Sequence, residues 1–301
     1  MILKYKNTDI TSSIDLEYYI HESNAEQKAD SLKLCFRDPD RLWPKWDPQL
    51  GDKLQLLEGS ENTGIMYVRK IRPEGTYFYI EASSMPLGVE IERSKAWQGI
   101  TFRQIGQDIA QRYGLGFSSY DAPDYKYKTL TQQSVNDMKF YENLCVLQGC
   151  AFLVYNETLI VYKETYLEEK AESAAYNLTT DNMLRIRRET KYDGCAISNG
   201  DMSYKYIKTE GKLIANKRIN QYIASKGEAE VIAKNMLKYL NKSKVAGEFY
   251  IAPIAGELAA GSVIRIESED GYKGKVFVSR IRHDSKTGRS KVFFREIQKY
   301  G

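Results

Sequence analysis

Residues 51–72 read GDKLQLLEGSENTGIMYVRKIR, and they align without a gap with residues 261–282, GSVIRIESEDGYKGKVFVSRIR, at a constant offset of 210. In both copies apolar residues alternate with polar ones on either side of a turn, which is typical of paired β-strands. The turns are Glu58-Gly59-Ser60 and Glu269-Asp270-Gly271. One β-hairpin unit is therefore expected near each end of the chain. The identical positions are Gly51/Gly261, Gly64/Gly274, Val68/Val278, Ile71/Ile281 and Arg72/Arg282.

The sequence around the first copy predicts strands throughout residues 1–90. Apolar and polar residues alternate over residues 14–20, 29–36 and 77–82. Residues 42–48 form an aromatic stretch in which Pro44 and Pro48 argue against a helix, so a loop is expected there.

Between the two copies the apolar period changes to that of helices. A helix is expected over residues 102–113 after a capping box of Thr101 and Gln104, and a second one from an N-cap at Ser134 to Gly149. With a hairpin over residues 151–163 they form an inserted α/β domain, residues 91–165, followed by a polar connector, residues 166–182. Residues 183–301 return to strands, with one helix over about residues 226–242. The expected class is α+β, mainly β, with two β domains related by internal duplication.

The composition fits a globular protein of two or three domains. The 301 residues include 42% apolar and 28% charged residues, and the 23 tyrosines favour half-buried strands and interfaces. A net charge of +4 is too small to indicate a dedicated nucleic-acid-binding domain, so no sequence-specific nucleic acid partner is expected. No apolar run has the length of a signal-peptide core or a membrane span, which predicts synthesis in the cytoplasm and no membrane-spanning segment.

The chain offers few groups for catalysis. Its two histidines, His21 and His283, lie in no recognisable catalytic motif. Asp38 and Asp40 flank Pro39 and are interpreted as turn residues rather than as a glycosidase pair. The sequence contains neither a phosphate-binding glycine loop nor cysteines at zinc-site spacing. We therefore expect no enzymatic activity, no cofactor and no metal. The four cysteines are expected to be reduced packing residues: Cys35, Cys145, Cys150 and Cys195.

Two groups of residues are candidates for a channel or an interface. Lys70 and Arg72 share strand parity with Val68, and Arg280 and Arg282 occupy the matching places in the second copy. They form either a repeated basic ring or the solvated ends of strands. Trp43 and Trp46 form either a contact platform or a cover over an open barrel end.

The chain resembles the baseplate hub proteins of contractile tails, the late control protein D and VgrG-type family, over nearly its full length. The order of the matching segments carries the resemblance, since no single motif is specific. They are Ala29-Asp30-Ser31-Leu32, Gly51-Asp52, Trp97-Gln98-Gly99-Ile100-Thr101, residues 133–140 (QSVNDMKF) and residues 261–283.

This resemblance implies two tube-like β-barrels per chain and a homotrimer whose six barrels adapt a hexameric tail tube to a trimeric central spike. The implied partners are the tail tube protein, the central spike protein and other baseplate proteins, with the tape measure protein as a further candidate. The protein would be incorporated into the tail baseplate of a phage, a tail-like bacteriocin or an injection system. Because the sequence stops at Gly301 without a long spike-like repeat, a separate spike protein is expected.

Two alternatives belong to other functional classes. One is a cell-wall-directed hydrolase that uses Asp38 or His283, and the other is a carbohydrate-binding tail module that uses the tyrosines with Trp43 and Trp46. Neither explains the spaced duplication as well as a ring adaptor does.

Overall fold

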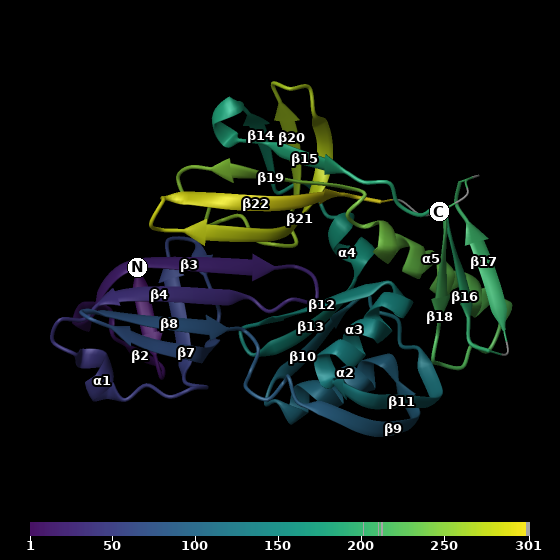
Figure 1. Ribbon diagram of the computed structural model, residues 1–301, viewed down its shortest axis with the longest axis horizontal. Helices are drawn as coiled ribbons and strands as arrows, with labels where there is room; N and C mark the ends of the chain where they lie inside the picture. The colour runs from purple at the N-terminus through teal and green to yellow at the C-terminus, as the bar shows by residue number, and fades with distance from the viewer. Residues whose placement is uncertain (201, 210, 212, 299–301) are drawn as a thin grey trace.

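The computed structural model describes residues 1–200, 202–209, 211 and 213–298. Figure 1 shows long strands stacked on one side of the molecule and a helix-containing part on the other. The expected class, α+β and mainly β, is confirmed.

The first β half contains eight strands and one short helix. Its strands pair in the order β3-β4-β8-β7-β5-β1, and the residues that alternate inward along them form one core with Leu34, Ile80 and Val68. The elements are β1 (Ile2–Tyr5), β2 (Thr8–Asp9), a 3-10 turn (Thr11–Ser13), β3 (Asp15–Asn24), β4 (Ser31–Arg37), α1 (Leu42–Trp46), β5 (Lys53–Glu58), β6 (Glu61–Asn62), β7 (Met66–Glu74) and β8 (Tyr77–Ser83).

The loop expected over residues 42–48 is wrong in part, because α1 occupies Leu42–Trp46. Pro44 is the third residue of this helix, where the backbone N–H has no partner within the helix and the fixed φ of proline is compatible. The Asp38 carboxylate accepts hydrogen bonds from Leu42 N at 2.7 Å and Trp43 N at 3.2 Å. Asp38 thus satisfies the free N–H groups at the start of α1.

The inserted region has a core of its own, built from two helices and two small sheets. The Thr101 and Gln104 capping box is confirmed at the start of α2. The Ser134 N-cap is wrong: Ser134 lies in β11, and Asn136 caps the next helix by accepting Lys139 N at 2.8 Å. The elements are β9 (Glu92–Thr101), α2 (Phe102–Arg112), β10 (Gly116–Tyr120), β11 (Lys126–Asn136), α3 (Asp137–Gln148), β12 (Cys150–Tyr155) and β13 (Thr158–Lys163).

The second β half repeats the strand order of the first, as β15-β19-β22-β21-β20-β14. The polar stretch expected as a connector, residues 166–182, contains the last three residues of α4 and all of β14, and Leu178 of β14 lies in the second core. The elements are α4 (Glu164–Glu168), β14 (Ala174–Leu178), a 3-10 turn (Thr180–Asn182), β15 (Arg185–Arg188), β19 (Val245–Ile251), β20 (Val263–Ser268), β21 (Lys273–Asp284) and β22 (Arg289–Glu296).

A further small unit is inserted between β15 and β19. The helix α5 (Lys226–Asn241) begins after the N-cap Ser225, close to the expected start at about residue 226, and packs on a sheet of β16 (Gly194–Ser198), β17 (Ser203–Ile207) and β18 (Ile214–Arg218). The sequence Ser198-Asn199-Gly200-Asp201 is typical of a hairpin tip, and Asp201 lies outside the described residues. The sequence alone does not separate this unit from the second β half.

The internal repeat extends to backbone detail. Residues 53–58 and 263–268 are strands at the offset of 210, and the register shift after Val68 in β7 recurs after Val278 in β21. Gly51 and Gly261 both have positive φ, +89° and +92°, and donate to the carbonyls of Val68 and Val278 at 2.8 Å. Glycine at this place permits the left-handed turn that enters each hairpin.

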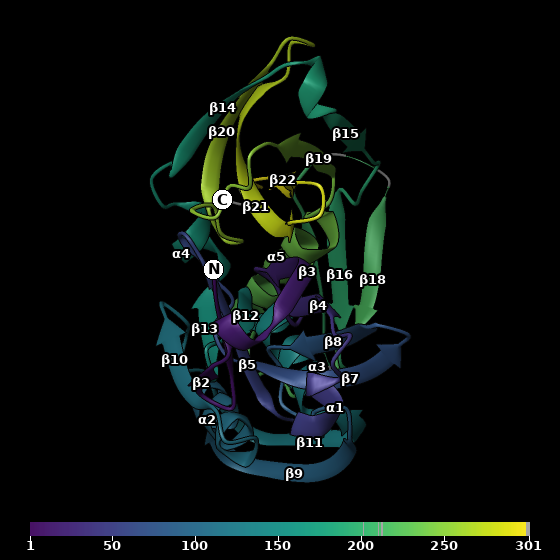
Figure 2. The same ribbon diagram turned by 90° about the vertical axis from the view of Figure 1, so that its left-hand side faces the viewer.

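The two halves share one sheet, because β3 of the first pairs with β21 of the second (Figure 2). The pairing of the described strands runs from β15 to β2 through both halves. We refer to the β3–β21 pair as the in-chain joint.

Candidate assembly interface

The in-chain joint is an antiparallel ladder that pairs Ile20–Asn24 with Arg280–Asp284. Ala25 N donates to Ser279 O and Ser285 N donates to Tyr19 O, both at 3.0 Å. In this ladder the odd-numbered residues therefore make the backbone hydrogen bonds between the two strands. Arg280 and Asn24 are even-numbered, so they face each other as a non-hydrogen-bonded pair. Arg280 also lies 3.3 Å from the Glu22 carboxylate.

Both histidines of the chain meet at this joint, directly opposite each other. Their rings are buried, with centroids 6.2 Å apart. His21 Nδ1 lies 2.9 Å from the Glu61 carboxylate, which also accepts from Tyr19 Oη at 3.0 Å, and His283 Nδ1 lies 2.8 Å from Ser290 Oγ. Burial lowers the pKa of His283, which keeps this ring neutral near pH 7.

The four cations that the sequence singled out lie on one face of the shared sheet. A line of directly paired residues crosses the sheet from Lys70 through Glu81, Lys33 and Ile20 to Asp284. Asp284 lies two residues after Arg282 on the same strand, so these two side chains point to the same side of the sheet. Directly paired residues point to the same side, so this face is opposite the one that carries Ile71 and Ile281 into the cores.

Three of these cations have neighbours within the chain. Arg72 lies 3.4 Å from Glu74 and over the Tyr79 ring, Arg280 contacts Glu22 and the Phe293 ring, and Arg282 lies 3.7 Å from Asp284. Lys70 is exposed. The structure thus brings Lys70 and Arg72 to the second half of β7, where this strand pairs with β8, and Arg280 and Arg282 to the joint.

The two tryptophans belong to the first core and its rim. Trp43 is only 1% exposed, stacks on Phe78 at 5.5 Å and contacts Trp46 edge to face at 5.2 Å. Trp43 is therefore not a surface contact residue. Trp46 is partly buried and packs against the same core.

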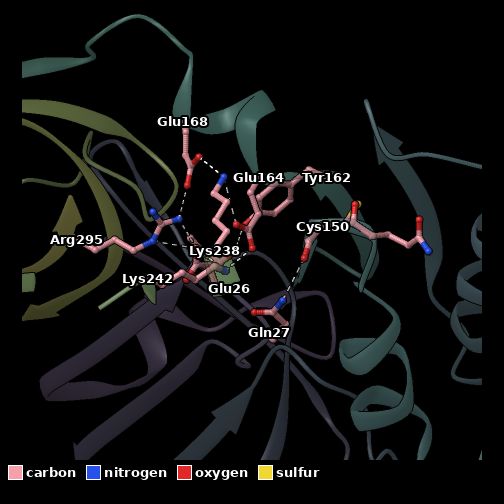
Figure 3. A network of polar contacts seen from close by, with 11 residues as sticks. Glu26, Gln27, Cys150, Tyr162, Glu164, Glu168, Lys238, Lys242 and Arg295 are labelled. Atoms are coloured by element: carbon pink, nitrogen blue, oxygen red, sulfur yellow. Dashed lines mark hydrogen bonds and ion pairs between the residues drawn. The ribbon is translucent and has the colours of Figure 1, made fainter. Parts of the chain in front are cut away.

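A network of buried charges connects four parts of the molecule (Figure 3). Arg295 of β22 lies 2.6 Å from Glu26, in the β3–β4 loop, and 2.8 Å from Glu168 of α4. The α5 ammonium groups complete the network: Lys238 lies 2.6 Å from Glu168, and Lys242 contacts both Glu26 and Glu164. Three carboxylates and three cations balance.

Burial alone would oppose ionisation of Glu26, but the charges of Arg295 and Lys242 outweigh it and lower the pKa of Glu26 to about 2. The network was not predicted from the sequence. A usable signal exists, because Glu164 and Glu168 are four residues apart, as are Lys238 and Lys242, so each pair shares one face of its helix.

The cysteines and Ser290 are engaged in packing and hydrogen bonding. The four cysteines are free and buried, as expected, and burial raises the pKa of Cys150 to about 12, so its thiol is not a nucleophile near pH 7. Ser290 is buried, and its Oγ accepts a hydrogen bond from Ala255 N at 2.9 Å. Within the described ranges, no three histidine, cysteine or carboxylate side chains gather as metal ligands.

No helix in the described part of the chain combines the length and apolarity needed to cross a bilayer.

The sequence matches no family model, and no curated protein matches it. Solved structures share its fold over almost its whole length. A tail protein from Neisseria meningitidis MC58 superposes with a TM-score of 0.77 at 10% identity, covering 98% of this chain and 95% of that one. The 43 kDa tail protein of prophage MuSo2 from Shewanella oneidensis gives 0.71 at 11% identity, covering 98% and 96%.

A third similar structure is the E. coli c3393 protein, described as a component of the type VI secretion system with structural similarity to the T4 bacteriophage tail proteins gp27 and gp5. Its TM-score is 0.64 at 12% identity, covering 99% of this chain and 77% of that one. The chain thus has the fold of phage tail proteins and of a type VI secretion component.

Proposed function

We propose that the protein is a structural component of a contractile tail, and within it the baseplate hub. Three copies would form a ring that joins a hexameric tail tube on one side to a trimeric central spike on the other. The fold shared with tail and secretion-system proteins supports the general role.

The observation that carries the hub role is the equivalence of the two β halves. Five strands follow the same order in each half with every neighbour antiparallel, and the two halves share the same bulge and the same glycine turn, at a constant offset over the hairpin. The sixth strands differ in direction, because β1 is antiparallel to β5 and β14 is parallel to β20. Two equivalent units per chain give six units in a trimer, and a ring of six similar units matches a sixfold partner while keeping threefold symmetry for the other.

In this proposal residues 1–90 and 183–301 form the two tube-like β-barrels, and residues 91–165 are inserted between them. Residues 166–182 link to the second barrel and add β14 to it. Lys70, Arg72, Arg280 and Arg282 would face the central channel as a pseudo-sixfold basic ring. The partners would be the tube protein, the spike protein, other baseplate proteins and the tape measure protein. The protein would act in the baseplate of a phage, a bacteriocin or an injection system, without enzymatic activity.

Native mass spectrometry over a dilution series tests this function. The purified chain is measured alone and with its candidate spike protein, and a species of three times 34.6 kDa, about 104 kDa, is expected in at least one sample. A monomer in both samples would remove the functional claim.

The channel assignment has its own test, since it is a finer claim. Reversing the charge of Lys70, Arg72, Arg280 and Arg282 together should disturb particle assembly or ejection. Normal assembly and ejection would show that these cations do not act in the channel.

A further inference from the structure

The in-chain joint provides a template for a second joint. Four strands of each half correspond through their pairing: β3, β4, β8 and β7 of the first half match β15, β19, β22 and β21 of the second. The registers fix the match residue by residue. In the first half His21 pairs with Leu32, which in turn pairs with Ala82. In the second half Ile186 pairs with Gly247, which in turn pairs with Phe294. His21 therefore corresponds to Ile186, Leu32 to Gly247 and Ala82 to Phe294.

The matches give constant offsets. Residues of β7 correspond to residues of β21 at +210, and residues of β3 correspond to residues of β15 at +165. The in-chain joint uses β3 and the second half of β21. The strand that corresponds to β3 is β15, and the segment that corresponds to the second half of β21 is residues 70–74 of β7. These two segments are the outer edges of the row formed by the eight corresponding strands.

Both of these edges are open among the described strands. Residues 70–74 pair only with β8, and β15 pairs only with β19. Glu189 N donates to Lys244 O on the β19 side at 2.9 Å, so the N–H groups of Ile186 and Arg188 point away from the sheet. An unpaired strand edge of this kind is a template for pairing with another chain.

We propose that residues 70–74 of one copy pair with residues 185–189 of a second copy, antiparallel and in the register of the in-chain joint. This inference rests on the proposed ring. Each residue of the in-chain joint is replaced by its counterpart, which is 210 lower for β21 and 165 higher for β3. The pair Arg280 and Asn24 then becomes Lys70 and Glu189, and the pair Asp284 and Ile20 becomes Glu74 and Arg185. The intermediate pairs are Ile71/Arg188, Arg72/Arg187 and Pro73/Ile186.

The charges in this register were not used to derive it, and they fit. Opposite charges face each other at both ends of the ladder, as Lys70 with Glu189 and Glu74 with Arg185, where directly opposed side chains lie about 5 Å apart at Cβ. The central arginines, Arg72 and Arg187, repel, and the carboxylates that lie beside them, Glu74 and Glu189, are shared with the two cross-strand pairs. Arg72 lies 3.4 Å from Glu74, and Arg187 lies 2.7 Å from Glu189.

The backbone also fits, with one hydrogen bond fewer than the in-chain joint. Pro73 takes the place of His283, whose N–H lies on the ladder side, and proline has no N–H to donate. Its carbonyl still accepts from Ile186, while Ile71 and Arg188 can exchange both bonds. Since each copy contributes one edge of each kind, the contact is head to tail and generates a ring or an open filament.

Disulfide trapping tests the register. Lys70 and Glu189 would form a non-hydrogen-bonded pair, with Cα atoms about 4.5 Å apart, within the range that a disulfide spans. The variant with Lys70→Cys and Glu189→Cys should form covalent multimers on mild oxidation, because the four natural cysteines are buried. Lys70→Cys with Arg185→Cys is the matched control, four residues and about 13 Å out of register, and should not cross-link.

The outcomes separate the register from the proposed function when native mass is measured on the same samples. Bands that stop at three chains support both. Bands that continue without limit support the register and overturn the trimeric ring. A native trimer without cross-links, or with equal cross-linking of the control, overturns the register and leaves the hub standing. A monomer without cross-links overturns both.

A charge exchange gives a second readout without new cysteines. Glu189→Lys places two lysines opposite each other and should weaken association about 10-fold. Adding Lys70→Glu should restore most of the loss. Equal weakening by the single and double variants would contradict the pairing of these two residues.

Discussion

Replacing Arg295 with methionine should strongly destabilise the protein. The guanidinium is 4% exposed, lies 2.6 Å from Glu26 and 2.8 Å from Glu168, and lies over the Phe277 ring. Without it the buried network holds three carboxylates and two cations. Breaking a buried ion pair by removing one partner costs about 3–5 kcal/mol, because a charge is left without compensation.

The pKa of Glu26 gives a second measure of the same effect. Its lowering from 4.5 to about 2 corresponds to about 3 kcal/mol in favour of the charged carboxyl, at 1.36 kcal/mol per unit. A depressed carboxyl pKa stabilises the fold fully above the unfolded value, and this contribution is lost as the pH falls through about 2. In Arg295→Met, Glu26 can take up a proton, so the loss of stability relative to the natural protein should shrink between pH 7.5 and pH 4.

Urea unfolding at both pH values, at one protein concentration, measures these changes. Arg37→Met is the control, since this side chain is 53% exposed, lies 2.9 Å from Glu17 and is outside the proposed contact between copies, so its loss should stay below about 1 kcal/mol. If Arg295→Met costs no more than the control at pH 7.5, the network does not hold the four parts together.

Four further substitutions test other parts of the structure by the same unfolding assay. The pKa of buried His283 is lowered, so protonation favours the unfolded chain and stability should decline below about pH 6.5. His283→Gln should make this decline less steep, and an unchanged pH profile would contradict this. Gly247→Ala should cost about 1–3 kcal/mol of stability, since a Cβ would lie 2.5 Å from Phe294 and 2.6 Å from a backbone oxygen. Gly227 in α5 has room for a Cβ, so Gly227→Ala should stabilise the protein by about 0.5–1 kcal/mol. Trp43→Ala should cost about 3–5 kcal/mol, and a loss below 1 kcal/mol would refute its place in the first core.

The hairpin repeat could be predicted from the sequence because strand alternation and turn glycines are local signals. Residues 51–72 and 261–282 carry both, and the structure adds the shared bulge after Val68 and Val278. The strands that complete each half could not be matched in this way. The β3–β15 match has an offset of 165 rather than 210, because the α5 unit is inserted after β15.

The parts of the site that depend on tertiary contacts could not be predicted, because no local sequence signal connects the residues that meet there. His21 and His283 are 262 positions apart and meet only through the in-chain joint. Glu26 and Arg295 lie in different halves, and no spacing links them. The sequence leaves Trp43 open to a surface interpretation, because an aromatic residue outside a strand can be exposed or can pack on a core, and only the tertiary contacts decide.

Class averages of the isolated oligomer by negative-stain electron microscopy test the central claim most directly. The account predicts a closed ring of six similar lobes around a central hole, built from three chains. A compact particle without a hole, or three lobes of one kind only, would contradict the proposal that the duplicated halves alternate around a hub.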